Sequence, residues 1–183
     1  MSREKGFVIG ASEDGIVYYR KDKNEYGLEI DQKSRKWLET VQRNLKKSFN
    51  KESKIRKTSK GYFRLNVYSK DLYNELLNFR RNPKIILRQN RSFQIGFLQG
   101  IFDAEGSIRL ERNHITLSSK RPETIKVVKK LLKDFEFQIG KLWKDKNNVV
   151  TIPFYGKDNM KKFSKLINFR HPEKLKRLEL LLS

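Results

Sequence analysis

The strongest constraint on the fold is an internal repeat. Shifted by 87 residues, the sequence matches itself in four segments of similar apolar and polar pattern, and a fifth segment matches at a shift of 90. The matched segments are 28–34 with 115–121, 38–45 with 125–132, 63–67 with 150–154, 68–71 with 155–158, and 78–80 with 168–170. Chance does not readily supply five ordered matches at almost one spacing, so the chain consists of two copies of one unit.

Each copy is expected to fold in the order helix, strand, strand, helix, strand, strand, helix, because apolar residues recur every three to four positions in the helical segments and alternate in the strands. The expected elements of the first copy are 4–14, 16–20, 26–31, 35–47, 53–57, 62–68 and 70–79, and those of the second are 92–105, 107–112, 114–118, 122–134, 138–144, 149–154 and 158–169. A last helix is expected at 173–182. The pattern predicts an α+β fold with half-domains at 1–80 and 92–183, joined by a basic linker at 81–91.

The chain is strongly basic. Lys and Arg number 42 against 21 Asp and Glu, and the formal net charge of +21 is spread over the whole length. Such an excess on a folded chain favours a polyanionic partner, above all a nucleic acid. The absence of Cys excludes disulfides and thiolate metal sites, and His114 and His171 alone do not favour a zinc site. No segment has the length of a membrane span and the N-terminus lacks the apolar core of a signal peptide, so we expect a soluble, intracellular protein.

The second copy opens with the segment FLQGIFDAEG, which ends at Gly106. Gly96, Gly100 and Ala104 recur every four residues, which leaves one helix face almost without side chains and lets a second helix approach closely. Glu105 ends this helix, where the helix dipole disfavours a carboxylate unless a cation is bound nearby. Gly106 is expected to close the helix as a left-handed cap. From its leucine onward, the segment resembles the nine-residue signature of the LAGLIDADG family of homing endonucleases.

The first copy opens with the related segment GFVIGASEDG, but it departs from the family pattern. Aligning Asp14 with the acid of the second copy puts Ile9 at the position of Gly100. Aligning Gly10 with Gly100 instead leaves one residue missing before the acid. We prefer Asp14 as the counterpart, because Asp-Gly must close the helix, and Glu13 remains the alternative. This departure leaves open whether the first half-site is fully active.

The resemblance covers nearly the whole chain and implies a specific arrangement. The two motif helices would pack at the centre, along a pseudo-twofold axis that relates two αββαββα half-domains, and two antiparallel sheets would form a saddle over double-stranded DNA. Asp14 and Glu105 would bind Mg²⁺, with Mn²⁺ able to replace it, and Gln32, Lys33 and Lys120 would lie near the scissile phosphates. The two lysines could instead be ordinary surface residues that precede a helix. The activity implied is site-specific, double-strand cleavage of a long asymmetric site by a monomer, as in intron or intein homing.

Alternation along the strands predicts which side chains face the DNA. These outward positions carry the basic, amide and aromatic groups that can bind phosphates and base edges in the major groove. The predicted set is Tyr18, Arg20, Lys54, Arg56, Arg64, Asn66, Arg109, Lys141 and Trp143. A charged sheet face exposed only to solvent would show the same pattern, but the net charge favours contact with DNA.

Two other functions fit the same sequence. An RNA-binding intron maturase could use the same basic saddle, and a DNA-binding protein could retain the fold with a degenerate first site. Neither function needs the acids, so the acid followed by Gly in both copies argues for the endonuclease.

Overall fold

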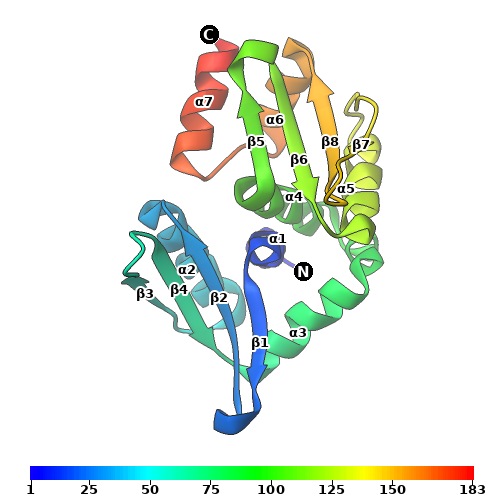
Figure 1. The fold of residues 1–183 in the computed structure, drawn as a ribbon. Helices are drawn as coiled ribbons and strands as arrows, with labels where there is room; N and C mark the ends of the chain where they lie inside the picture. The colour runs from blue at the N-terminus through cyan, green and yellow to red at the C-terminus, as the bar shows by residue number, and fades with distance from the viewer.

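The computed structural model describes residues 1–183 and shows two four-stranded antiparallel sheets with a pair of helices between them (Figure 1). The first half comprises α1 (Arg3–Ala11), η1 (Ser12–Asp14), β1 (Ile16–Arg20), η2 (Lys21–Lys23), β2 (Glu25–Gln32), α2 (Arg35–Phe49), β3 (Lys54–Lys57), β4 (Phe63–Tyr68) and α3 (Lys70–Arg81). After η3 (Pro83–Arg88), the second half comprises α4 (Arg91–Glu105), β5 (Gly106–Arg109), η4 (Leu110–Arg112), β6 (His114–Ser119), α5 (Pro122–Asp134), β7 (Trp143–Lys144), β8 (Val150–Tyr155), α6 (Lys157–Leu166) and α7 (Pro172–Leu182). The η elements are 3₁₀ turns. No helix of the structure has both the length and the apolar character that crossing a membrane requires.

The two sheets are copies of each other, with strand orders β1-β2-β4-β3 and β5-β6-β8-β7. Leu28 of β2 lies opposite Val67 of β4, and Ile115 of β6 lies opposite Phe154 of β8, so the same pairing recurs 87 residues later. All four side chains are buried, which places the core on the corresponding face of each sheet. The predicted α+β fold with two repeated units is confirmed.

Local chemistry sets where the helices begin. Ser34, Ser69 and Asn90 each accept a hydrogen bond from the backbone N–H three residues on, at the starts of α2, α3 and α4. Such a side chain satisfies one of the free N–H groups of a first helical turn. In α5 and α7 the first residue is Pro122 or Pro172, whose fixed φ suits this position and which has no N–H to leave unpaired.

Two predicted strands of the second half are shorter than expected. The segment predicted as a strand at 138–144 pairs only at its end as β7, apart from a single bridge between Ile139 and Phe154. Next to that bridge the partner residue is Pro153, which accepts a hydrogen bond from the Gly140 N–H but has no N–H to return. The strand predicted at 107–112 ends at residue 109, because the chain turns through η4 and a left-handed Asn113.

The central helices α1 and α4 pack backbone against backbone. A Cβ atom added at Gly10 would lie 2.7 Å from the backbone nitrogen of Ile101, and one added at Gly100 would lie 2.7 Å from that of Ala11. These contacts are reciprocal, so Gly10 is the counterpart of Gly100, and the alignment that puts Ile9 there is wrong for the packing. Only residues without a side chain allow two helices to approach this closely.

Candidate active site at the ends of the central helices

The two central helices carry their terminal acids equally far beyond the close glycine contact, although the two segments differ in length. From Gly10 to Asp14 the chain has one residue fewer than from Gly100 to Glu105. The last three residues of the first segment form the 3₁₀ turn η1, whereas α4 stays α-helical to Glu105. A 3₁₀ turn rises about 2.0 Å per residue and an α-helix about 1.5 Å, so three residues of one advance as far as four of the other. The tighter turn therefore compensates for the missing residue.

The glycines after the two acids act differently from the prediction. Gly106 was expected to be a left-handed cap, but its φ of −74° and ψ of 153° are extended, and Gly15 is extended as well. A Cβ at Gly106 would overlap the carbonyl oxygen of Phe102, and one at Gly15 would lie 2.8 Å from the carbonyl oxygen of Glu29. Glycine is required here for close approach to the main chain as each helix turns directly into a strand.

Asp14 and Glu105 lie within electrostatic reach of each other. Burial raises the pKa of Glu105 to about 7, and the negative charges of Asp14 and Glu13 add to this rise, against the opposing charge of Lys174. Partial burial also raises the pKa of Asp14, although Gln32 Nε2 donates a 2.7 Å hydrogen bond to Asp14 Oδ2. Asp14 thus raises the pKa of the neighbouring Glu105, and both carboxyl groups are partly buried, an arrangement that a bound cation would relieve.

The neighbouring acids, Glu13 and Asp103, have a different role. Asp103 is buried, and its oxygens accept hydrogen bonds from Trp37 Nε1 at 3.1 Å and from two backbone N–H groups, those of residues 170 and 171. Glu13 Oε2 lies 3.3 Å from an Arg121 nitrogen and 3.5 Å from Thr124 Oγ1. Residues 37 and 124 are equivalent positions of the repeat. Asp103 therefore holds α4 to α2 of the first half, and Glu13 holds the end of the first central segment to α5 of the second half. Glu13 is thus the structural equivalent of Asp103, and Asp14 that of Glu105.

A partly buried cation caps each helix end, and the sequence analysis identified neither. The Arg80 guanidinium donates to the carbonyl oxygens of Ser12 and Gly15, the second at 2.8 Å. Lys174 Nζ donates to the last carbonyls of α4, at 3.1 Å to that of Phe102. Burial lowers the pKa of Arg80 to about 10 and that of Lys174 to about 8. Arg80 lies in one of the matched Asn-Phe-Arg triplets of the repeat, a signal that could have identified it, whereas no sequence pattern marks Lys174.

Of the three predicted catalytic partners, one touches an acid. Gln32 lies at the end of β2 and holds Asp14, whereas its repeat counterpart, Ser119, accepts a hydrogen bond from the Arg121 backbone. Lys33 and Lys120 are exposed, and Lys33 Nζ lies 5.8 Å from the centre of the Tyr62 ring. The two lysines therefore border the site without contacting either acid in this structure.

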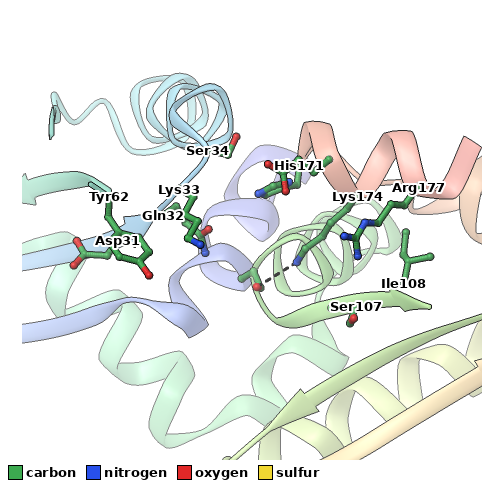
Figure 2. A pocket seen from close by; sticks show the side chains of 13 residues that line it. Asp31, Gln32, Lys33, Ser34, Tyr62, Ser107, Ile108, His171, Lys174 and Arg177 are labelled. Atoms are coloured by element: carbon green, nitrogen blue, oxygen red, sulfur yellow. Dashed lines mark hydrogen bonds between the residues drawn. The ribbon is translucent and has the colours of Figure 1, made fainter. Parts of the chain in front are cut away.

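A cavity of about 380 Å³ opens beside the acids, between the end of β2 and helix α7 (Figure 2). Asp31 and Lys33 line one wall, and Lys174 and Arg177 of α7 line the other. Ser107 of β5 lies at its lower edge in this view. The site is therefore bordered by basic side chains from both halves.

The outward sheet face of the first half is rich in ion pairs. Arg64 forms two 2.6 Å hydrogen bonds with Asp31, and Arg20 contacts Glu25 at 3.0 Å and Glu29 at 3.1 Å. Residues Tyr18, Arg20, Lys54, Arg56, Arg64 and Asn66, all predicted to share one face, do so in the observed register.

The corresponding face of the second half carries hydroxyl and aromatic groups instead. A cavity of about 530 Å³ on this face is lined by Arg109, Arg112, His114, Thr116, Ser118, Trp143, Thr151 and Tyr155. Arg109 and Trp143 are thus brought together, as predicted. Lys141 is not, because it lines a separate hollow with Lys129 and Lys133 of α5.

The comparisons with known proteins agree with this geometry. The model of the LAGLIDADG-like domain matches residues 12–79 and again residues 92–168, once in each half. The chain belongs to this LAGLIDADG family, as its second motif suggested.

Its relatives include proteins of very different length. The chain is 22% identical to the homing endonuclease I-ApeI of Aeropyrum pernix, over 96% of this chain and 86% of that protein. It is 28% identical to a glutamine–fructose-6-phosphate aminotransferase of Methanocaldococcus jannaschii, over 85% of this chain but only 16% of that protein. The crystal structure of I-DmoI in complex with DNA and Ca superposes with a TM-score of 0.76 at 22% identity and covers 97% of both chains.

Proposed function

We propose that the protein is a site-specific DNA endonuclease that makes a double-strand break by metal-dependent hydrolysis of phosphodiester bonds. The observation that carries this proposal is the pair of crowded carboxylates, Asp14 and Glu105, at the adjoining ends of the two central helices. I-ApeI and I-DmoI, to which the chain is similar, are homing endonucleases, and structures of I-DmoI include its target DNA.

Asp14 and Glu105 would hold a divalent cation, which we propose is Mg²⁺, with Mn²⁺ as a substitute. Hard cations prefer oxygen ligands, and two carboxylates leave further positions for phosphate oxygens and water. The raised pKa of Glu105 supports this fit, because a bound cation would favour its ionised form. When bound, such an ion supplies an activated water and neutralises charge on the leaving oxygen. Complexes of I-DmoI with its DNA contain Mn, Ca or Mg.

The residues around the acids position them and the DNA. Gln32 would orient Asp14 through the hydrogen bond between them, so its loss would mainly affect the first half-site. Lys33 and Lys120, which are exposed beside the site, would turn toward the scissile phosphates when DNA is bound. Glu13, held to the opposite half, is in this proposal a positioning residue and not a metal ligand.

Both outward sheet faces would bind DNA in the major groove. Two buried polar atoms on these faces, Asn66 Oδ1 and His114 Nδ1, have no hydrogen-bond partner in the protein, and such atoms favour a polar ligand. Because the two faces carry different side chains, the recognised site would be asymmetric. A monomer would suffice, since one chain contains both halves.

The test is a cleavage selection from a plasmid library with a randomised target region, in the presence of Mg²⁺. We expect linear plasmids that share one asymmetric sequence, with Glu105→Gln protein yielding none. Specific DNA binding without cleavage in Mg²⁺ or Mn²⁺ would refute the nuclease and support a DNA-binding role. Tight binding of an intron RNA with no DNA selected would support the maturase.

A further inference from the structure

Lys174 holds an unusual position at the end of α4. Its Nζ donates hydrogen bonds to the carbonyl oxygens of Phe102, Asp103 and Ala104, the first at 3.1 Å and the last at 3.3 Å. Figure 2 shows this side chain extending from α7 to the helix end. Helix α7 is held on the body by Leu178 and Leu181, which are buried. The ammonium group is therefore positioned by a packed helix and not by a flexible loop.

The ammonium group of Lys174 forms no salt bridge with a carboxylate. Three carboxyl groups face it within electrostatic reach, those of Asp103, Asp14 and Glu105. Its hydrogen bonds nevertheless all go to main-chain carbonyls, and Asp103 already accepts three donors of its own. The positive charge thus acts through space on Asp14 and Glu105, and it lowers the pKa of both carboxyl groups.

The end of the first central segment, at η1, has no cation that acts on both acids in this way. Arg80 also caps main-chain carbonyls, but the charged groups that face it are Glu13 and Arg121, which already contact each other. Helix α7 follows the second copy and has no equivalent in the first. Arg121 also lowers the pKa of Glu105, but Lys174 is the one cation that acts on both Asp14 and Glu105.

We propose that Lys174 is a resident counter-cation of the acid pair: it offsets the charge of Asp14 and Glu105 when no metal is bound, and thereby sets how tightly a divalent metal binds. This inference rests on the proposed function, since it takes these acids as the metal ligands. It makes Lys174 a positioning residue with two measurable effects. It stabilises the metal-free protein, and its repulsion weakens metal binding.

Thermal unfolding with increasing Ca²⁺ or Mn²⁺, without DNA, tests this directly. Lys174→Gln keeps a hydrogen-bond donor for the carbonyls but removes the charge, and Lys174→Arg keeps the charge. We expect Lys174→Gln to lower the Tm of the metal-free protein and to bind Ca²⁺ about tenfold more tightly, so that metal raises its Tm more than it raises that of the unsubstituted protein. Lys174→Arg should respond to metal like the unsubstituted protein. Arg177→Met, which lines the same cavity but touches no carbonyl, is the matched control.

The outcomes separate the two claims. If Lys174→Gln lowers the Tm but leaves the affinity for Ca²⁺ unchanged, Lys174 only caps the helix and the counter-cation is refuted. If neither metal changes the Tm of the unsubstituted protein, while Glu105→Gln behaves identically, the acid pair is not a metal site and the proposed function loses its basis. If Lys174→Gln does not fold, the comparison of Lys174→Arg with Arg177→Met decides, because a changed metal affinity in the charge-conserving variant would also refute the proposal.

Discussion

The two halves of the molecule share one topology but complete their helix ends with different residues. In the first half, a 3₁₀ turn carries Asp14, Gln32 holds the carboxylate, and Arg80 caps the carbonyls. In the second half, an unbroken α-helix carries Glu105, whose pKa is shifted by burial and charge alone, and Lys174 caps the carbonyls. What both ends share is the place of an acid, a tight turn into a strand and a cap for free carbonyls. The fold therefore fixes the path of the main chain at both helix ends, and different side chains bind its free carbonyl groups and hold the acids in place.

The strongest way to test this equivalence is to neutralise each acid in turn. We expect Glu105→Gln and Asp14→Asn each to lower cleavage of at least one strand on the order of 10²–10³-fold, because the charge that would hold the metal is lost while the shape is kept. DNA affinity should change little. The measurement is the rate of nicking and linearisation of a supercoiled target plasmid. Full activity of Asp14→Asn, with loss in Glu13→Gln, would reverse the assignment of the first acid.

The close contact of the central helices predicts the next largest effect. A side chain at position 100 meets the backbone of α1, so Gly100→Leu must force the helices apart. We expect a loss of stability of about 1–3 kcal/mol or more, and a loss of cleavage about a hundredfold, because both acids depend on the helix positions. Ser92→Leu, at an exposed position of the same helix, is the control for melting temperature and cleavage rate. Normal cleavage by Gly100→Leu would contradict the packing.

The two acids that hold the halves together should differ in strength. Asp103→Asn should cost about 1–3 kcal/mol, because three donors converge on this buried carboxylate and an amide NH₂ cannot accept from them. Glu13→Gln should cost less, because its partner Arg121 is partly open to solvent. Chemical denaturation of both variants measures the difference. Equal or reversed losses would contradict this difference, because they would show that the solvent exposure of Arg121 does not weaken its contact with Glu13.

The smallest effects should distinguish the two sheet faces. Arg64→Ala and Arg109→Ala should each weaken base preference by about 1–3 kcal/mol, the first at one end of the DNA site and the second at the other. Lys141→Ala should leave base preference unchanged, because Lys141 lies with the lysines of α5. Selection of target sequences by each variant provides the comparison. A change of preference at the same end for both arginines would contradict the two-sided reading of DNA.

The sequence predicted the repeated units, the order of elements and the helix pair, because apolar periodicity and the glycine spacing report directly on buried faces. It did not predict that Gly106 is extended, since a requirement for close approach and a requirement for positive φ select the same residue. It also gave no sign that Gln99, on α4, is buried and donates to the Ile167 carbonyl at 2.6 Å. Lys174 could not be predicted for a related reason: its partners are carbonyl oxygens, which every residue has, so no pattern of side chains marks them.

Crystallography of the DNA complex with Mn²⁺ would show whether Asp14 and Glu105 together form the metal site. Anomalous scattering from Mn²⁺ locates the ion independently of activity. We expect an anomalous peak between the carboxylates of Asp14 and Glu105, and we expect it to be lost in Glu105→Gln. A peak bound to Glu13 or Asp103 instead, or cleavage of both strands in a complex with no peak beside either proposed ligand, would contradict it.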